Sequence, residues 1–167
     1  MKIRTLAEIL LNPYPKPKQL IKGLINKGEL VLVTGQFDSF KSQFGIELAR
    51  CVVTGQRFLN KFEVADTGPA LIVQKEIHPG MYDERMMNMN IPPALTDLVH
   101  VSYDEEFAFR LRPPGYKREL EEEIERGKYK LVVFDPLTNF WPPEGGFDEN
   151  DNISVSRILR PLLDLRV

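Results

Sequence analysis

Cysteine and histidine are scarce in this sequence, with one cysteine, Cys51, and two histidines among 167 residues. A single cysteine cannot form a disulfide within the chain, and one cysteine with two histidines makes no zinc-binding pattern. No apolar run approaches the roughly 20 residues that a membrane-spanning helix needs. These absences exclude a disulfide framework, a structural zinc module and a transmembrane helix, and we expect Cys51 to be buried and inert.

A leader sequence and an excess of one charge are lacking as well. The first residues, MKIRTLAEILLNPYPKPK, contain no long apolar core and no small-residue cleavage site, so we expect a cytoplasmic protein. The net charge is −2, which argues against a polybasic nucleic-acid binder. It does not argue against DNA contacts through a few loops at the centre of a ring, where several copies add their charges.

The composition that remains is that of a soluble globular domain. Hydrophobic residues make up 43% and charged residues 28% of a chain long enough for one hydrophobic core. Residues 1–28 combine a short helical pattern with three prolines between positions 13 and 17, which force an extended stretch. We therefore predict an N-terminal arm over residues 1–28 and a core domain over residues 29–167.

Apolar runs alternate with helical patterns along the core. Strands are predicted at Glu29–Thr34, Ala70–Gln74, Leu98–Ser102 and Leu131–Asp135. Helices are predicted at Ser42–Thr54 with Gly55 as its C-terminal cap, and at Met81–Met89, Tyr116–Arg126 and Ile153–Leu165. Strands that alternate with helices in this way predict an α/β fold with a mostly parallel sheet.

The segment between the first predicted strand and helix has the spacing of a phosphate-binding loop. The pattern Gly-x-x-x-x-Gly-Lys-[Ser/Thr] is met with phenylalanine in place of the second glycine. Backbone N–H groups of such a loop curl around a phosphate, and the helix N-terminus adds partial positive charge. The predicted ATP-binding residues are Gly35, Gln36, Phe37, Asp38, Ser39, Phe40, Lys41, Ser42 and Gln43.

Phe40 leaves two outcomes open. With an ordinary φ and a side chain directed away from the phosphates, phenylalanine is tolerated; otherwise affinity falls or the site is inactive. The alternative reading of the whole motif is a chance strand–turn–helix with Lys-Ser at the start of its helix.

Two carboxylates complete the predicted site. Asp135 ends the apolar strand LVVFD, where an aspartate holds Mg²⁺ beside the loop serine, so Ser42 and Asp135 are the predicted metal residues. Glu76 follows the strand ALIVQ and is predicted, with Lys41, to be catalytic, because a carboxylate near the γ-phosphate orients or deprotonates the attacking water. The alternatives are a turn cap before Pro136 for Asp135 and an exposed strand-end glutamate for Glu76.

The order GELVLVTG-QFDSFKS, TGPALIVQKE, KLVVFDPLTNF and DENDN resembles the RecA-like P-loop ATPases of the RepA-type hexameric replicative helicase group, with an AAA-25-like domain. The similarity extends over most of residues 20–165. It implies a three-layer P-loop NTPase fold, ATP bound with Mg²⁺ between the subunits of a homo-oligomeric ring, and hydrolysis coupled to movement along DNA. By this resemblance Lys41 and Ser42 match the phosphate-loop residues, Asp135 the Walker B aspartate and Glu76 the catalytic glutamate.

Two features depart from that family. Its members continue with further strands and an arginine finger, so we expect this chain to be a C-terminally truncated product, weakly active or inactive. The segment of residues 138–152, which can face the central channel, contains four acidic residues and no lysine or arginine, a poor composition for DNA contact.

Three functions follow from the sequence. The first is an ATP-hydrolysing DNA helicase or a related replication or repair motor, with single-stranded DNA as a candidate partner and no membrane. The second is a nucleotide-binding regulatory module without turnover. The third is a small-molecule kinase, for which residues 109–117 (FRLRPPGYK) are the only arginine-rich candidate for a lid.

Overall fold

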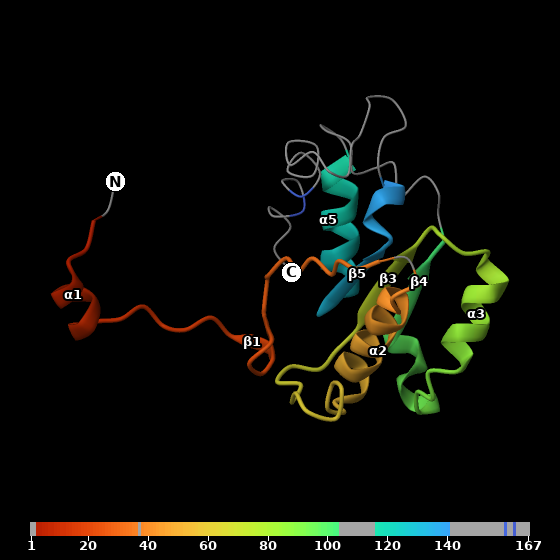
Figure 1. Cartoon of the computed structure of the whole chain (residues 1–167), viewed down its shortest axis with the longest axis horizontal. Helices are drawn as coiled ribbons and strands as arrows, with labels where there is room; N and C mark the ends of the chain where they lie inside the picture. The colour runs from red at the N-terminus through yellow and green to blue at the C-terminus, as the bar shows by residue number, and fades with distance from the viewer. Residues whose placement is uncertain (1–2, 37, 104–115, 141–158, 160–161, 163–167) are drawn as a thin grey trace.

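A parallel β-sheet forms the centre of the fold (Figure 1). The computed structural model describes residues 3–36, 38–103 and 116–140, together with residues 159 and 162. Within this part of the chain, strand β3 (Ala70–Gln74) lies between β4 (Val99–Ser102) and β5 (Leu131–Asp135), and both neighbours run parallel to it. The predicted α/β class with a parallel sheet is therefore confirmed, and the bounds of β3 and β5 are those expected from their apolar runs.

The register of β3 and β5 decides which side chains share a face. Ala70 pairs with Leu131, Ile72 with Val133 and Gln74 with Asp135. Because side chains alternate between the faces of a strand, these three pairs belong to one face of the sheet. Gln74 and Asp135 therefore lie side by side at the carboxyl edge.

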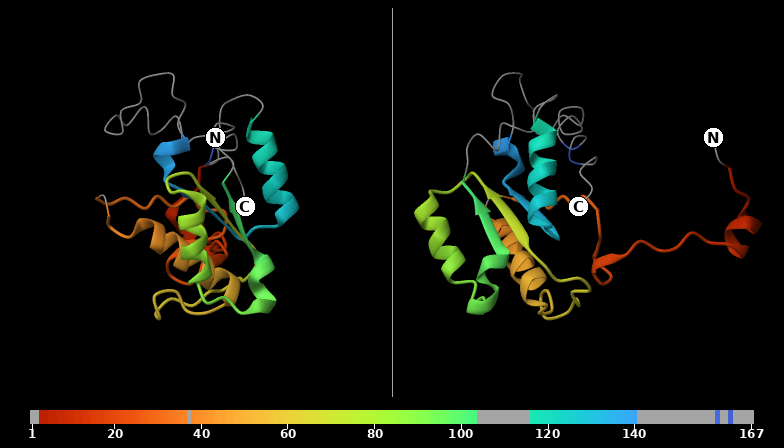
Figure 2. Two further views of the ribbon diagram at one scale, coloured as in Figure 1. Left: turned by 90° about the vertical axis from the view of Figure 1, so that its right-hand side faces the viewer. Right: turned by 180° about the vertical axis from the view of Figure 1, so that it is seen from behind.

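Helices cover both faces of the sheet (Figure 2). Helix α2 (Lys41–Thr54) and helix α3 (Pro79–Met87) pack on the face of Ile72 and Val133. Helix α5 (Tyr116–Gly127) packs on the opposite face through Ile124. Short 3₁₀ helices precede β4 and follow β5, at Pro93–Leu98 and Leu137–Phe140.

Helix α2 is buried on two sides. Ile46, Ala49 and Val53 face the sheet, whereas Leu48, Cys51 and Val52 contact a β-hairpin of β1 (Gln19–Ile21) and β2 (Ile25–Asn26). The helix ends as predicted at Gly55, which adopts a left-handed conformation and donates its N–H to the carbonyl of Cys51. The hairpin belongs to the predicted arm, and the domain boundary at residue 28 remains a prediction.

The direction of α2 is opposite to that of the strands. Near its C-terminus the carbonyl of Val52 accepts a hydrogen bond from Gly68, which stands just before β3. Near its N-terminus Gly45 lies against β5, where a Cβ on Gly45 would come 3.1 Å from Cγ1 of Val133. The N-terminus of α2 and the carboxyl ends of the strands therefore meet at the same edge of the sheet.

The strand predicted at Glu29–Thr34 is wrong. Residues 29–34 form no strand, and Leu30, Val31, Leu32 and Val33 are 37–50% exposed. Residues 29–33 and strand β5 line the same cavity, which has a volume of about 620 Å³. An apolar run becomes a strand only when another strand offers its backbone groups, and no described strand lies beside residues 29–34.

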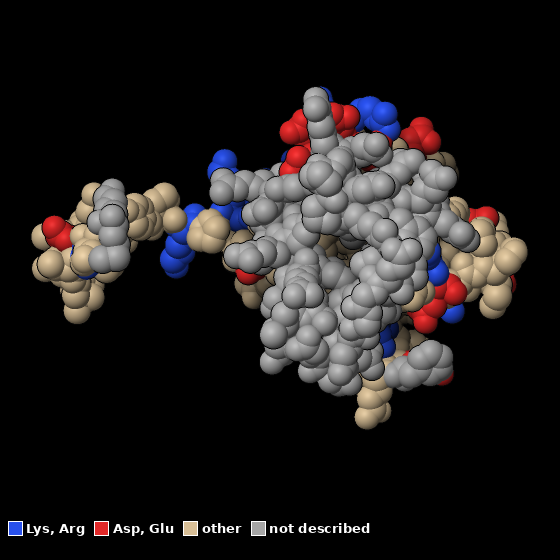
Figure 3. Space-filling model, turned by 90° about the horizontal axis from the view of Figure 1, so that it is seen from above, with Lys and Arg blue, Asp and Glu red and all other residues tan. Residues whose placement is uncertain are grey.

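Helix α1 (Leu6–Leu11) stands apart from the sheet and its helices (Figures 1 and 2). Thr5 and Glu8 form a capping box at its start, yet none of its residues is buried. Figure 3 shows a largely uncharged surface on this outlying part of the chain. Residues 12–18 connect α1 to the hairpin without regular secondary structure.

No helix among the described residues is long and apolar enough to cross a membrane. The predicted helix Ile153–Leu165 lies outside the described residues except for Leu159 and Leu162, which are helical. Residues 109–115 of the candidate kinase lid and residues 141–152 of the channel-facing segment also lie outside them.

We expect Gly45→Val to lower the free energy of unfolding by about 1–3 kcal/mol, because its side chain forces α2 away from Val133. Urea unfolding monitored by circular dichroism measures this change. Adding Val133→Ala to Gly45→Val should restore part of the loss, and a strictly additive double variant would contradict the contact.

Candidate functional site

The loop of residues 35–40 folds back on the side chain of Lys41. The ammonium nitrogen of Lys41 donates to the carbonyl oxygen of Gly35 at 3.1 Å and of Gln36 at 2.6 Å, and lies 3.3 Å from Oγ of Ser39. The Ser39 hydroxyl in turn donates to the Gln36 carbonyl at 2.6 Å. One positive charge is thus held inside a curl of backbone.

The curl leaves no room for a side chain at its first residue. A Cβ on Gly35 would lie 2.6 Å from Oγ of Ser39, closer than real Cβ contacts. Glycine at this position therefore permits the close approach of the two ends of the loop.

The N-terminus of α2 opens into this curl. Among the described residues no side chain caps the helix, and the first turn closes with the N–H of Phe44 donating to the carbonyl of Phe40 at 2.9 Å. The N–H groups that precede Phe44 cannot pair within the helix, and the aligned peptide dipoles add partial positive charge. Together with Lys41 they supply the hydrogen-bond donors and positive charge that anions favour, and Gln43 lies exposed in the same turn.

Phe40 adopts a left-handed backbone conformation, with φ 59° and ψ 23°. This conformation is the one that the glycine of the usual motif accommodates without strain, so the condition of an ordinary φ is not met. The phenyl group is 79% exposed and lies outside the core. Phe37 lies outside the described residues.

Asp135 lies at the same edge as Lys41 and Ser42. Gly45 contacts Val133, Lys41 stands one helical turn before Gly45, and Asp135 stands two residues beyond Val133 on the same face of β5. Lys41 and Asp135 line the same cavity of about 620 Å³. The structure therefore brings together the two ends of the predicted site that lie 94 residues apart in sequence.

Glu76 is held by a residue that the sequence reading missed. The carbonyl oxygen of the Gln74 side chain accepts from the N–H groups of Glu76 at 2.6 Å and Ile77 at 2.8 Å, and its amide donates to the carbonyl of Ile77 at 2.8 Å. Gln74 is 4% exposed, whereas Glu76 is exposed. A polar residue that closes an otherwise apolar buried strand was the available signal.

The oxygen groups at this edge suit a magnesium ion better than a metal bound by protein alone. No group of three or more histidine, cysteine or acidic residues is found among the described residues. Mg²⁺ prefers oxygen ligands and usually keeps several waters beside one or two carboxylates and substrate phosphates. The hydroxyl of Ser42 and the carboxylate of Asp135 fit that pattern of ligands.

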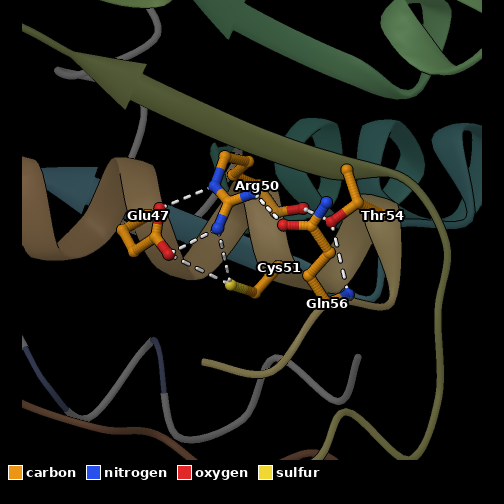
Figure 4. A network of polar contacts seen from close by, with 5 residues as sticks. All are labelled: Glu47, Arg50, Cys51, Thr54 and Gln56. Carbon is orange, nitrogen blue, oxygen red and sulfur yellow. Dashed lines mark hydrogen bonds and ion pairs between the residues drawn. The ribbon is translucent and has the colours of Figure 1, made fainter. Parts of the chain in front are cut away.

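A second polar cluster on α2 has a structural role (Figure 4). Arg50 donates to both carboxylate oxygens of Glu47 at 2.7 Å, and the thiol of Cys51 donates to Glu47 at 3.3 Å. Thr54 and Gln56 extend the cluster toward the end of the helix. Burial, together with the Glu47 carboxylate, raises the pKa of Cys51 to about 11, so the thiol is inert as predicted.

One family matches this chain. The model of a family described as an AAA domain matches residues 2–167. No curated protein matches the chain, and no solved structure matches it either.

We expect Phe40→Gly to raise the free energy of unfolding by about 0.5–1 kcal/mol, because glycine adopts the left-handed conformation without strain. Phe40→Ala is the matched control, since alanine removes the exposed ring but retains the strain. Urea unfolding should give Phe40→Gly a higher free energy of unfolding than both Phe40→Ala and the parent. Equal stability of the two variants would contradict a strained residue at position 40.

The Glu47–Arg50 pair should stabilise the fold in a pH-dependent way. Hydrogen bonds from Arg50 lower the pKa of Glu47, so its contribution is present above the pKa of the unfolded chain and is lost as the pH falls through the folded value. Because the pair is partly exposed, we expect Glu47→Gln to cost only about 0.5–1 kcal/mol at pH 7.

Urea midpoints at pH 7 and pH 3 measure this effect, and the difference from the parent should shrink at pH 3. Glu84→Gln, at an exposed carboxylate of α3, is the control and should behave alike at both pH values. If Glu47→Gln loses the same stability at both pH values, the loss comes from packing and not from the charge of Glu47.

Proposed function

Because this chain belongs to the AAA domain family of P-loop ATPases, we propose that it binds ATP at the loop of residues 35–42 and hydrolyses it as the motor domain of a DNA helicase or a related replication or repair protein. The observation that carries the proposal is the Lys41 ammonium, held inside a backbone curl at the uncapped N-terminus of α2. A cation and unpaired N–H groups at one helix end form a binding site for phosphate.

Phosphate binding rests on an exchange of partners at Lys41. Its ammonium donates to backbone carbonyls of Gly35 and Gln36, which are neutral acceptors. Phosphate oxygens carry charge and form stronger hydrogen bonds with the same donor. The curl and the charge of Lys41 are thus arranged before the nucleotide binds.

Ser42 and Asp135 would hold the magnesium ion that accompanies ATP. When bound, this ion neutralises charge on the β- and γ-phosphates. Ser42 follows Lys41 in the first turn of α2. Asp135 lies at the same end of α2, because Gly45 packs against Val133, two residues before Asp135. This juxtaposition supports their assignment as the metal residues.

Glu76 is the residue that we assign to activation of the attacking water. Its exposed carboxylate stands on the loop after β3, beside the strand that ends at Asp135. Gln74 fixes the backbone of Glu76, so the carboxylate projects from a defined point of the edge. A positioned carboxylate near the γ-phosphate can orient the water and accept its proton.

We further propose that the chain acts as a homo-oligomeric ring with single-stranded DNA as its partner. This step rests on the resemblance of its motifs to the hexameric helicase group. In a ring, several copies of a weakly charged chain combine their fields at the centre.

A nucleotide-sensing module without turnover is the second candidate. Phe40 favours it, since a phenylalanine in a left-handed conformation adds strain to the loop where the motif has glycine. A loop under strain can still bind phosphate and yet position it poorly for attack.

Titration of a fluorescent ATP analogue with Mg²⁺ tests the proposal. We expect Lys41→Ala to weaken binding by about 10- to 100-fold, the loss of one charge-assisted hydrogen-bonding group. Glu76→Gln is the matched variant and should bind like the parent while losing turnover. Equal binding by the parent and Lys41→Ala would contradict the site.

Turnover with and without single-stranded DNA separates the two candidates. DNA-stimulated phosphate release by the parent, absent in Glu76→Gln, supports the motor. Tight binding without release under either condition supports the sensing module.

A further inference from the structure

Tyr82 is the largest fully buried side chain among the described residues. It lies in the first turn of α3 and belongs to the cluster of residues between this helix, α2 and the sheet. Its ring makes an edge-to-face contact with Tyr103, with ring centroids 6.1 Å apart. Phenylalanine would fill this space equally well, so packing does not account for the hydroxyl group.

The hydroxyl of Tyr82 has no hydrogen-bond partner in the part of the chain that the structure describes. Burial of an unpaired hydroxyl destabilises a fold, and such groups are rare in native proteins. The neighbouring tyrosine differs, because the hydroxyl of Tyr103 donates to the carboxylate of Asp83. The buried hydroxyl of Tyr82 is therefore available for a hydrogen bond that the described residues do not form in this structure.

The carboxylate of Asp135 lies on the face of the sheet that α3 covers. Val133 packs in the same cluster as Tyr82, and Asp135 follows two residues later on the same face of β5. Burial first, and then the charge of Asp135, raise the pKa of Tyr82. As a phenol, Tyr82 can donate its hydroxyl to a carboxylate at this edge.

We propose that Tyr82 is a positioning residue for the metal–nucleotide site: its hydroxyl, unpaired among the described residues, donates a hydrogen bond to Asp135, directly or through one water, once the magnesium nucleotide is bound, and so orients this carboxylate. The inference rests on the proposed nucleotide site and adds a residue from α3 to it. Groups that hold a metal ligand in place commonly change metal affinity by 10- to 100-fold when they are removed.

Tyr82→Phe tests the proposal with two readouts. In the absence of nucleotide we expect the urea midpoint to rise by about 0.5 M, because an unpaired buried hydroxyl is removed. With a fluorescent ATP analogue we expect the Mg²⁺ concentration at half-saturation to rise about 10-fold. Binding of the analogue in excess chelator should stay unchanged.

Tyr103→Phe is the matched control. Its ring contacts the ring of Tyr82, but the hydroxyl that it loses donates to Asp83. It should leave the Mg²⁺ dependence at the parent value. A Tyr82→Phe variant with the Mg²⁺ dependence of the parent would overturn the inference and leave the nucleotide site standing.

Two other results would also contradict the proposed role of Tyr82. A lower urea midpoint for Tyr82→Phe would mean that the hydroxyl is paired within the folded chain, which overturns the inference. Failure of the parent itself to bind the magnesium nucleotide would overturn the proposed function and this inference together.

Discussion

The contact between Gly45 and Val133 is the constraint on which the candidate site depends. A helix with any larger residue at position 45 would stand farther from β5, because a Cβ there already comes within 3.1 Å of Val133. Burial of α2 on two sides, against the sheet and against the β1–β2 hairpin, keeps the helix at this distance. The positions of Lys41 and Ser42 relative to Asp135 follow from this packing.

The loop itself is a compromise between backbone strain and electrostatics. Asp38 and Phe40 both have positive φ angles, which cost free energy in residues other than glycine. The same conformation turns the chain so that carbonyls surround the Lys41 ammonium and the N-terminus of α2 stays without a side-chain cap. Strain of this kind also occurs elsewhere in the described chain, at Leu59, Asn60, Asn90 and Lys128, so positive φ alone does not mark the site.

The sequence predicted those parts of the fold that depend on local pattern. The continuous apolar runs of β3 and β5, and Gly55 at the end of α2, lie where the pattern placed them. The run at Glu29–Thr34 has the same composition and forms no strand, since pairing depends on a neighbour that composition does not reveal.

The site follows the same division. Lys41 and Ser42 are predicted by motif spacing and Asp135 by its place at the end of an apolar strand, and their roles stay predictions. The left-handed backbone of Phe40 answers the question that its sequence raised. Gln74 had a signal in the sequence, a polar residue at the end of an apolar strand, but its hydrogen bonds to the backbone of Glu76 and Ile77 appear only after folding. The unpaired hydroxyl of Tyr82 has no signal in the sequence.

The isolation of helix α1 has a consequence for local unfolding of the chain. It has six residues, none of them buried, and an irregular stretch connects it to the hairpin. A helix this short is marginal in water even with a good cap, so its amide hydrogens should exchange through local fraying alone. Hydrogen exchange in α1 will then report its own opening equilibrium, while the amides of α2 and β3 report global unfolding.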